Sequence, residues 1–194
     1  MRLPLSPLDT VLFPGCFLDL QIFEARYLDM VSQCLKAGHG FGVVHILDGK
    51  EVGAAPAAFS HIGCEALIRD WQQLPNGLLG IRVEGGRRFD VQSFEVLRDQ
   101  LAVAQVAWRS EADSQPLAEQ HADLVVLLAA LGQHPMVKTL GLGGAVSDQA
   151  ALASQLAYLL PFDAEQKIEL LGLDEPASQL EQIQSLLEQL QDGA

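Results

Sequence analysis

The sequence predicts an α+β protein in which a β-rich N-terminal domain, covered by one helix, precedes a helical C-terminal domain. Apolar side chains alternate with a period of two in much of the first half, and recur at three-to-four spacing in the second. Between the two patterns, residues 110–116 lose this periodicity and become rich in Ser, Glu, Asp, Gln and Pro. We therefore expect two domains, at 1–112 and 113–194.

The N-terminal domain shows several short apolar segments that are typical of strands. Strands are expected at residues 11–13, 41–47, 61–71, 78–84 and 101–108. In the fourth of these, Leu79, Ile81 and Val83 share one face, the pattern of a half-buried strand. Residues 75–77 indicate a hairpin turn, in which Asn-Gly would supply the positive φ angles that a tight turn requires. We therefore expect the strands at 61–71 and 78–84 to pair as the two arms of this hairpin.

One helix is expected among these strands, from Glu24 until Gly38 ends it. Its apolar positions recur at helical spacing: Phe23, Tyr27, Met30 or Val31, and Leu35. A helix with one apolar face needs a partner surface, so we expect it to cover an open side of the sheet.

Helices account for the second half of the chain. They are expected at residues 117–133, 147–160 and 163–171, and from Pro176 onward. Ser147 is interpreted as a helix cap, and Asp163 with Gln166 as a capping box. The last helix carries an apolar stripe of Leu180, Ile183, Leu186, Leu187 and Leu190. The stripe spans under two heptads, which favours packing on the preceding helices over a coiled coil with a partner.

Composition excludes several classes of protein. With 12 Lys and Arg against 25 Asp and Glu, the formal charge is −13, which repels nucleic acid and anionic lipid. No apolar run approaches the roughly 20 residues of a membrane span, and the N-terminus lacks a signal-peptide core. We expect a cytoplasmic protein. The cysteines, Cys16, Cys34 and Cys64, fit neither a disulfide framework nor a metal site, and are interpreted as buried residues.

No pattern of catalytic or metal-binding residues is credible. The stretch 132–139 resembles a phosphate-binding loop, but Val137 stands where glycine is required and the stretch follows a predicted helix, not a strand. A serine nucleophile motif is absent, and the five histidines are scattered singly. We therefore predict no enzymatic activity, no catalytic residue, no metal and no cofactor.

Two charged residues in apolar surroundings suggest a structural contact. Glu24 lies inside the segment 22–27, and Arg88 follows Gly85-Gly86 at a predicted strand end. One interpretation is ordinary surface charge. The other is a partly buried ion pair between Glu24 and Arg88 that joins the first helix to the sheet.

The same segments resemble the Lon substrate-binding domain family. Leu3-Pro4-Leu5 and the following Val11 to Gly15 are similar to its opening strand and turn, Leu20 to Met30 to its most distinctive motif, and Gly85 to Val91 to a later Gly-x-x-Arg-Phe signature. Residues 152–171 are similar to its helical part, so the resemblance covers nearly the whole chain. Asp19 departs from it, since the family usually has proline there. The family-motif residues, structural or binding in role, are Phe13, Pro14, Ile22, Phe23, Glu24, Arg26, Tyr27, Gly85, Arg88 and Phe89.

The resemblance implies a fold and a function. The fold is a β-rich PUA-like pseudo-barrel followed by a small helical bundle. The function is binding of proteins or unfolded peptide segments, in protein quality control or as an adaptor, without the ATPase and protease domains of Lon. This predicts an exposed apolar patch. A small-molecule pocket in the barrel mouth is the alternative, and RNA binding would require Arg82, Arg87 and Arg88 to form a basic patch. The oligomeric state and the partner's identity stay open.

Overall fold

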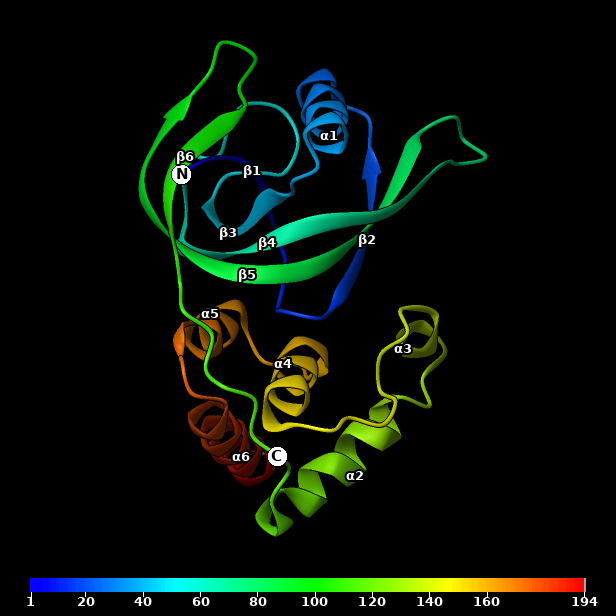
Figure 1. The fold of residues 1–194 in the computed structure, drawn as a ribbon, viewed down its shortest axis with the longest axis vertical. Helices are drawn as coiled ribbons and strands as arrows, with labels where there is room; N and C mark the ends of the chain where they lie inside the picture. Colours follow the sequence, from blue (N-terminus) through cyan, green and yellow to red (C-terminus); the bar gives the residue numbers. More distant parts are fainter. Residues whose placement is uncertain (194) are drawn as a thin grey trace. The chain divides into compact units, whose positions relative to one another are not determined.

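The chain folds into two compact units, Met1–Arg109 and Ser110–Ala194. The computed structural model describes residues 1–193 of the chain. The first unit holds a six-stranded sheet with one α-helix, and the second unit is helical (Figure 1). The predicted α+β class is confirmed at this level.

The sheet of the first unit closes into a ring of pairings. Its strands are β1 (Arg2–Leu8), β2 (Phe17–Ile22), β3 (Phe41–Asp48), β4 (Ala58–Gln73), β5 (Leu79–Val96) and β6 (Ala102–Trp108). Their order is β2-β5-β4-β3-β1-β6, and β5 also pairs with β6. Only the β1–β3 pairing is parallel. Five strands therefore pair in a closed circuit, and β2 adds to the outside of that circuit along the first part of β5.

The long strand β5 is continuous through Gly85-Gly86, where the sequence indicated a strand end. Its first part pairs with β2 and its second part with β6. At the change of partner, the backbone of Gly85 exchanges hydrogen bonds of 2.8 Å with Gly15 and Cys16. A side chain at residue 85 would collide with the backbone carbonyl of Phe13. Glycine is required here because two backbones approach closely, not because the strand ends.

The first strand was placed wrongly by the sequence pattern. Residues Val11–Phe13 are apolar because they are buried, but they form an irregular segment, whereas β1 lies earlier, at Arg2–Leu8. Pro4 and Pro7 argue against a central strand. They are accommodated because β1 pairs with β6 only through residues 2–4 and with β3 only through residues 5–8.

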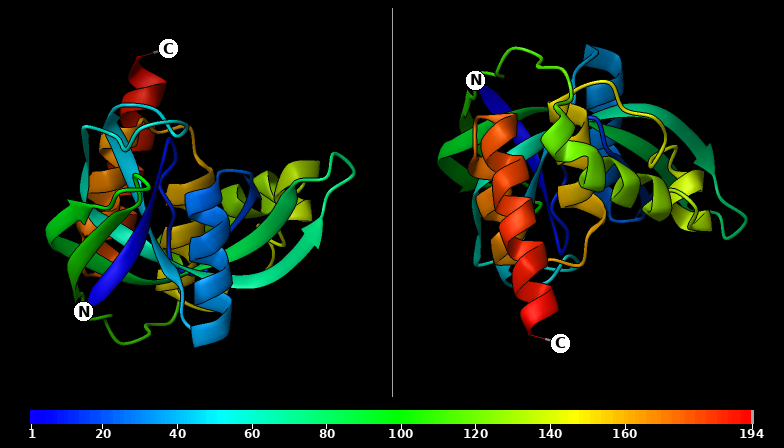
Figure 2. Two further views of the ribbon diagram at one scale, coloured as in Figure 1. Left: turned by 90° about the horizontal axis from the view of Figure 1, so that it is seen from above. Right: turned by 90° about the horizontal axis from the view of Figure 1, so that it is seen from below.

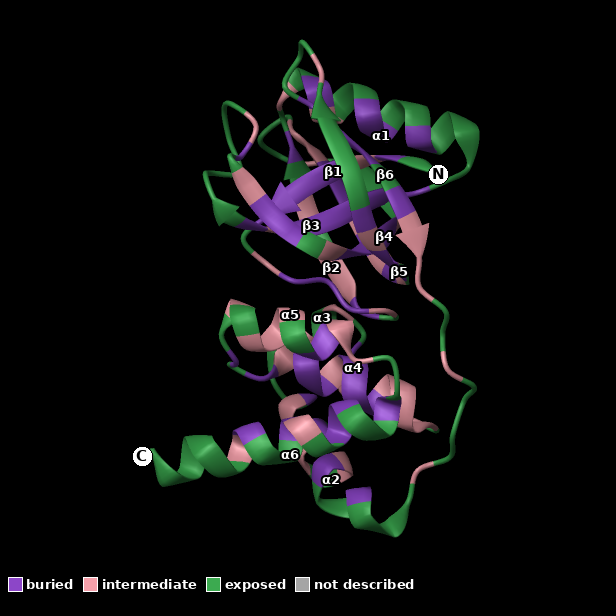
Figure 3. Ribbon diagram, turned by 90° about the vertical axis from the view of Figure 1, so that its left-hand side faces the viewer, coloured by how far each residue is buried: buried purple, intermediate pink, exposed green. Residues whose placement is uncertain are grey.

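The helix of the first unit is α1 (Ala25–Ala37), and it ends at Gly38 as predicted. Gly38 adopts a φ of 73° and donates its N–H to the carbonyl of Cys34. The buried face, however, consists of Arg26, Met30, Val31 and Cys34. It is rotated by about one residue from the predicted stripe. Leu35 consequently lies about half in solvent, as does Phe23, which precedes the helix, and α1 alternates between buried and exposed positions in Figure 3.

The β4–β5 hairpin is present and longer than expected, and its far end projects from the sheet (Figure 2). Its turn is closed by hydrogen bonds between Leu74 and Leu78 and from Gly77 to Leu74. Only Gly77 has a positive φ, of 83°; Asn76 instead accepts a hydrogen bond from the Leu78 N–H through its side chain. The expectation of two positive φ angles was wrong.

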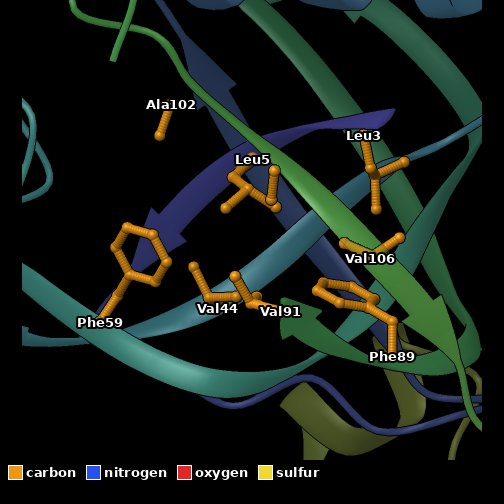
Figure 4. Packing of buried hydrophobic residues seen from close by; sticks show 9 residues of the cluster. Leu3, Leu5, Val44, Phe59, Phe89, Val91, Ala102 and Val106 are labelled. Atoms are coloured by element: carbon orange, nitrogen blue, oxygen red, sulfur yellow. The ribbon is translucent and has the colours of Figure 1, made fainter. Parts of the chain in front are cut away.

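The core of the first unit lies inside the ring of strands. Leu3 and Leu5 of β1, Val44 of β3, Phe59 of β4 and Phe89 of β5 contribute to one buried cluster, and Figure 4 shows these side chains converging. The Phe89 ring meets the Trp108 ring edge to face, with centroids 5.9 Å apart. Strand alternation therefore directs one face of each strand inward, as the period of two predicts.

The second unit contains one 3-10 helix and five α-helices among its described residues. They are η1 (Glu119–His121), α2 (Ala122–Leu131), α3 (Pro135–Thr139), α4 (Gln149–Leu159), α5 (Ala164–Gly172) and α6 (Pro176–Asp192). The predicted capping box of Asp163 and Gln166 is confirmed, whereas α4 is capped by Asp148 and not by Ser147. The phosphate-loop-like stretch forms the short helix α3 after α2.

The apolar stripe of α6 is used mostly inside the second unit. Leu180, Ile183 and Leu186 are buried, and α6 packs against α4 and α5 (Figure 2). Gln179 supports the packing by donating a hydrogen bond to the carbonyl of Leu170. Leu190, at the end of the stripe, is exposed.

Candidate binding surface

Strand β2 forms an open edge of the sheet. It pairs only with β5, and the described part of the chain places no strand on its other side. The N–H of Gly85 donates to the carbonyl of Cys16, and the carbonyl of Gly85 accepts from the N–H of Gly15, so the Cys16 carbonyl faces β5. Backbone direction alternates along an antiparallel ladder, so Leu18, Leu20 and Ile22 also direct their backbone groups toward β5. Asp19 and Gln21 direct theirs toward the open edge.

A groove follows this open edge, and we call it the edge groove. It has a volume of about 280 Å³. One wall is β2 at residues 19–22, and the other is the end of β1 at residues 6–8 with Glu51 and Val52. Because β6 stops pairing with β1 at Pro4, residues 6–8 are not covered by β6. Phe23, Glu24 and Tyr27, at the start of α1, also line the groove.

Glu24 organises one end of the edge groove. Its carboxylate lies 3.1 Å from the guanidinium of Arg26, and also accepts a hydrogen bond of 3.3 Å from the N–H of Gly53. Arg26 is 7% exposed and stacks over the Tyr27 ring at 4.7 Å. The expected ion pair between Glu24 and Arg88 is therefore wrong. Arg26 lies two residues after Glu24 in the chain and forms the ion pair instead, whereas Arg88 is buried in β5.

A second hollow lies on the outer face of the sheet beside β2, and we call it the outer hollow. Its volume is about 440 Å³, and polar residues of β2, β4 and β5 line it: Asp19, Gln21, Asp70, Gln72 and Arg82, with Trp71 and Leu74 at the side. Arg82 donates two hydrogen bonds to Asp19, of 2.7 and 2.9 Å. The guanidinium holds the pKa of the Asp19 carboxyl below its usual range, so Asp19 is ionised at neutral pH.

Exposed apolar side chains lie among the residues that line the two hollows. Phe23 is 51%, Val52 55% and Trp71 60% exposed. Phe23 and Val52 line the edge groove, and Trp71 lines the outer hollow. Large apolar side chains in solvent next to an unpaired strand edge are typical of contact surfaces.

The structure divides the family-motif residues between two places. Ile22, Phe23, Glu24 and Tyr27 line the edge groove, with Arg26 directly behind it. The others lie where the segment 13–16 meets β5: Phe13, Arg88 and Phe89 are buried, Gly85 contacts the backbone of Phe13, and Pro14 is half-buried.

Several groove residues were not found from the sequence. Ser6, Glu51, Val52 and Trp71 carry no motif, and only the folding of distant segments brings them beside β2. Val52 and Trp71 are apolar residues that stand among polar neighbours near a loop and a turn, which is a possible signal of a contact surface. The signal is weak, because single exposed apolar residues are common.

Metal-binding clusters, membrane-spanning helices and reactive cysteines were also sought among the described residues. These residues contain no group of three or more metal-ligating side chains, and no helix among them is long and apolar enough to cross a membrane. The cysteines are free and buried, as predicted, and burial raises the pKa of the Cys34 thiol to about 11. A thiol that stays protonated at neutral pH is a poor nucleophile.

The basic patch required for RNA binding is not formed by the three arginines considered. Arg82 pairs with Asp19, and Arg87 pairs with Glu65 at 3.0 Å while its guanidinium lies over the Trp108 ring. Arg88 is only 2% exposed. Their charges are compensated or withdrawn from the surface.

Comparison with known proteins identifies the family to which this fold belongs. The family model of the ATP-dependent protease La (LON) substrate-binding domain matches residues 2–189. The chain belongs to this family.

Individual relatives agree with the family match. A crystal structure of a Lon N-terminal domain protein from Xanthomonas campestris is 34% identical, with a TM-score of 0.78 over 95% of this chain and 98% of that one. The N-terminal domain of Mycobacterium avium complex Lon protease, at 18% identity and a TM-score of 0.63 over 94% of this chain and 96% of that one, shares the fold. Lon protease of Roseiflexus castenholzii is 34% identical over 95 residues, which are 48% of this chain and 12% of that protein. The matches thus concern a substrate-binding domain, not a protease domain.

Proposed function

We propose that this chain is a non-catalytic module that binds extended or unfolded segments of other proteins at the open edge of β2 and the edge groove. The observation that carries the proposal is the coincidence of an unpaired strand edge, a groove beside it, and the exposed side chains of Phe23 and Val52. The family match to a substrate-binding domain supports it. A role in protein quality control or as an adaptor follows from this binding.

The proposal extends to the fold type, the domain bounds, the cellular location and the class of partner. The closed circuit of strand pairings supports a PUA-like pseudo-barrel, which we propose is followed by a small helical bundle, with domains at 1–112 and 113–194. We also propose a cytoplasmic location. The compensated arginines and the charge of −13 support a protein partner over a nucleic acid.

A small-molecule site is the second candidate, because the volume of the outer hollow falls within the range of about 300–1,000 Å³ that is usual for ligand pockets. Such pockets are mostly lined by apolar side chains, whereas carboxylates, amides and a guanidinium dominate this hollow. Its lining therefore favours contact with a polar or charged protein segment.

The test is binding of a permanently unfolded protein. Reduced, carboxamidomethylated lysozyme should bind the full chain, and native lysozyme should not. Phe23→Ser should weaken the interaction about tenfold, the equivalent of about 1.4 kcal/mol. Leu47→Ser is the matched control, because Leu47 is exposed but lines neither hollow, and it should change the affinity less than about twofold. Equal binding by both variants, or none by the unmodified chain, would contradict the proposal.

A further inference from the structure

We infer that the segment bound at this surface is basic and extended, and that it adds to the open edge of β2 as a seventh strand with alternating apolar and basic side chains. This inference rests on the proposed function and specifies the mode of binding and the class of segment. Backbone geometry, side-chain alternation and charge support it separately.

The backbone of β2 is suited to accept a strand. Asp19 and Gln21 direct their N–H and C=O groups outward, and two residues with this orientation supply up to four hydrogen bonds to an incoming chain. The edge groove lies along this side of β2, which gives the added chain a place to lie.

Side chains of an added strand would alternate between two environments. Leu20 and Ile22 project to the face of β2 shared with buried Ile81, and they line the edge groove with Leu8 and Val52. Asp19 projects to the opposite face, where it pairs with Arg82. Every second residue of the added strand would therefore meet apolar groups, and the residues between would meet the polar outer face.

The charges around β2 favour positively charged residues in the added strand. Four carboxylates line the two hollows, those of Asp19, Glu24, Glu51 and Asp70, against the single guanidinium of Arg82. Asp19 and Glu24 are paired with arginines. Among the described residues, Glu51 accepts its hydrogen bond from the backbone N–H of Asp9, whereas Asp70 accepts one from the N–H of Trp71 and also interacts electrostatically with Arg82. Asp70 lies on the polar outer face, and Glu51 lines the edge groove, so long Lys or Arg side chains of the added segment can reach a carboxylate on either side of β2.

The same charges disfavour a second copy of this chain as the occupant of the edge. Each copy carries a formal charge of −13, and β2 itself contains Asp19 and no basic residue. Two such edges would bring like charges together, which opposes pairing.

The charge requirement is tested with three ten-residue peptides in which Val alternates with Lys, Gln or Glu. The full chain should bind the Lys peptide about tenfold more tightly than the Gln peptide at low ionic strength, and the Glu peptide more weakly than either. The advantage of the Lys peptide should shrink in 0.5 M salt, because exposed charges are screened. The double variant Glu51→Gln, Asp70→Asn keeps the two side-chain oxygens that accept hydrogen bonds, and should reduce the Lys-to-Gln ratio to about threefold or less.

Strand addition is tested with Gln21→Pro. Proline removes an N–H that points away from β5, so the ladder to β5 stays intact and the variant should fold. It should weaken binding of the Lys peptide about tenfold or more, whereas Gln21→Ala, the matched control, should change it less than about threefold. Circular dichroism and sedimentation of both variants accompany the binding measurements.

The outcomes separate this inference from the proposed function. Equal affinities for the Lys and Gln peptides, together with weaker binding by Phe23→Ser, would overturn the charge requirement and leave the proposed function standing. A folded Gln21→Pro protein that binds as Gln21→Ala does would overturn strand addition. If Gln21→Pro instead converts a dimer to a monomer, the occupant is a second copy and the inference fails. Absence of all binding to unfolded lysozyme would remove the proposed function itself.

Discussion

Two regions of the first unit contain the family motifs, and they differ in how the motif residues are used. Where the segment 13–16 meets β5, Phe13, Arg88 and Phe89 are almost completely buried and Gly85 lies against a backbone. At the junction of β2 and α1, Phe23 is half in solvent, and Glu24 and Tyr27 line a groove. Motifs that are equally clear in the sequence thus supply buried core residues in one region and surface residues in the other. Burial, not the motif, distinguishes them.

Substitution of the two motif phenylalanines should show the largest contrast. Phe89→Ala removes a ring from the centre of the core cluster and should cost about 3–5 kcal/mol of unfolding free energy. Phe23→Ala should cost less than about 1 kcal/mol, because the ring is already half exposed. Both tryptophans, Trp71 and Trp108, lie in the first unit, so urea unfolding followed by tryptophan fluorescence reports on this unit. Similar costs for the two variants would contradict the comparison.

A methyl group at Gly85 should come next in effect. Gly85→Ala drives a Cβ into the backbone of Phe13, which cannot move without shifting the turn at Gly15, and should cost about 3 kcal/mol. Gly86→Ala is the neighbouring control. There the nearest atoms belong to the side chains of Glu65 and Leu67, which can adjust, so a cost of about 1 kcal/mol is expected in the same measurement. The reverse order of costs would show that the close contact at Gly85 is not limiting.

Removal of Glu24 should have an intermediate effect, because Glu24 belongs to the surface region but supports a buried arginine. Glu24→Ala leaves Arg26 without its carboxylate and Gly53 without its acceptor, and should cost about 2 kcal/mol. The Nε of Arg26 already has no hydrogen-bond partner among the described residues, so little compensation is available. Glu24→Gln keeps an acceptor for Gly53 and should recover part of the loss. A thermal melt that is unchanged in Glu24→Ala would argue that Arg26 is solvated.

The smallest effect concerns the ion pair of Asp19 and Arg82 on the exposed face. Asp19→Asn should cost less than about 1 kcal/mol at pH 7, since the pair is largely in solvent. The pKa of Asp19 is lowered by folding from its ordinary value of 3.8, so its stabilisation is fully present above that pH and is lost as the pH falls through the lower, folded pKa. The stability difference between wild type and variant should therefore shrink below about pH 4. A difference that grows on acidification would contradict this assignment.

Elements with a clear local signal were predictable from the sequence. The strands β3 and β6, the hairpin of β4 and β5, the helix α1 with its Gly38 end, and the Asp163 capping box all lie where period, turn residues or caps indicated them. The errors occurred where tertiary contacts override local pattern. Residues 11–13 are apolar because they are buried, although they pair with no strand. The prolines of β1 are tolerated because each part of that strand is paired on one side only.

The candidate surface was predictable only in part. The segment Ile22–Tyr27 was a candidate because its charged residues stand among apolar ones, and four of its residues line the edge groove. The partner of Glu24 and the opposite wall of the groove depend on distances across the fold. A single sequence does not contain those distances, and a face rotated by one residue on α1 was enough to expose Leu35.

The pairing of the first strand with the last has a consequence for biosynthesis. Arg2 lies beside Gln105, so the circuit of strands cannot close until more than 100 residues of chain have left the ribosome. Contacts between residues this far apart in sequence slow folding. During that interval β1 and the growing hairpin lack their partner β6, so the apolar side chains that later fill the ring of strands stay accessible for longer.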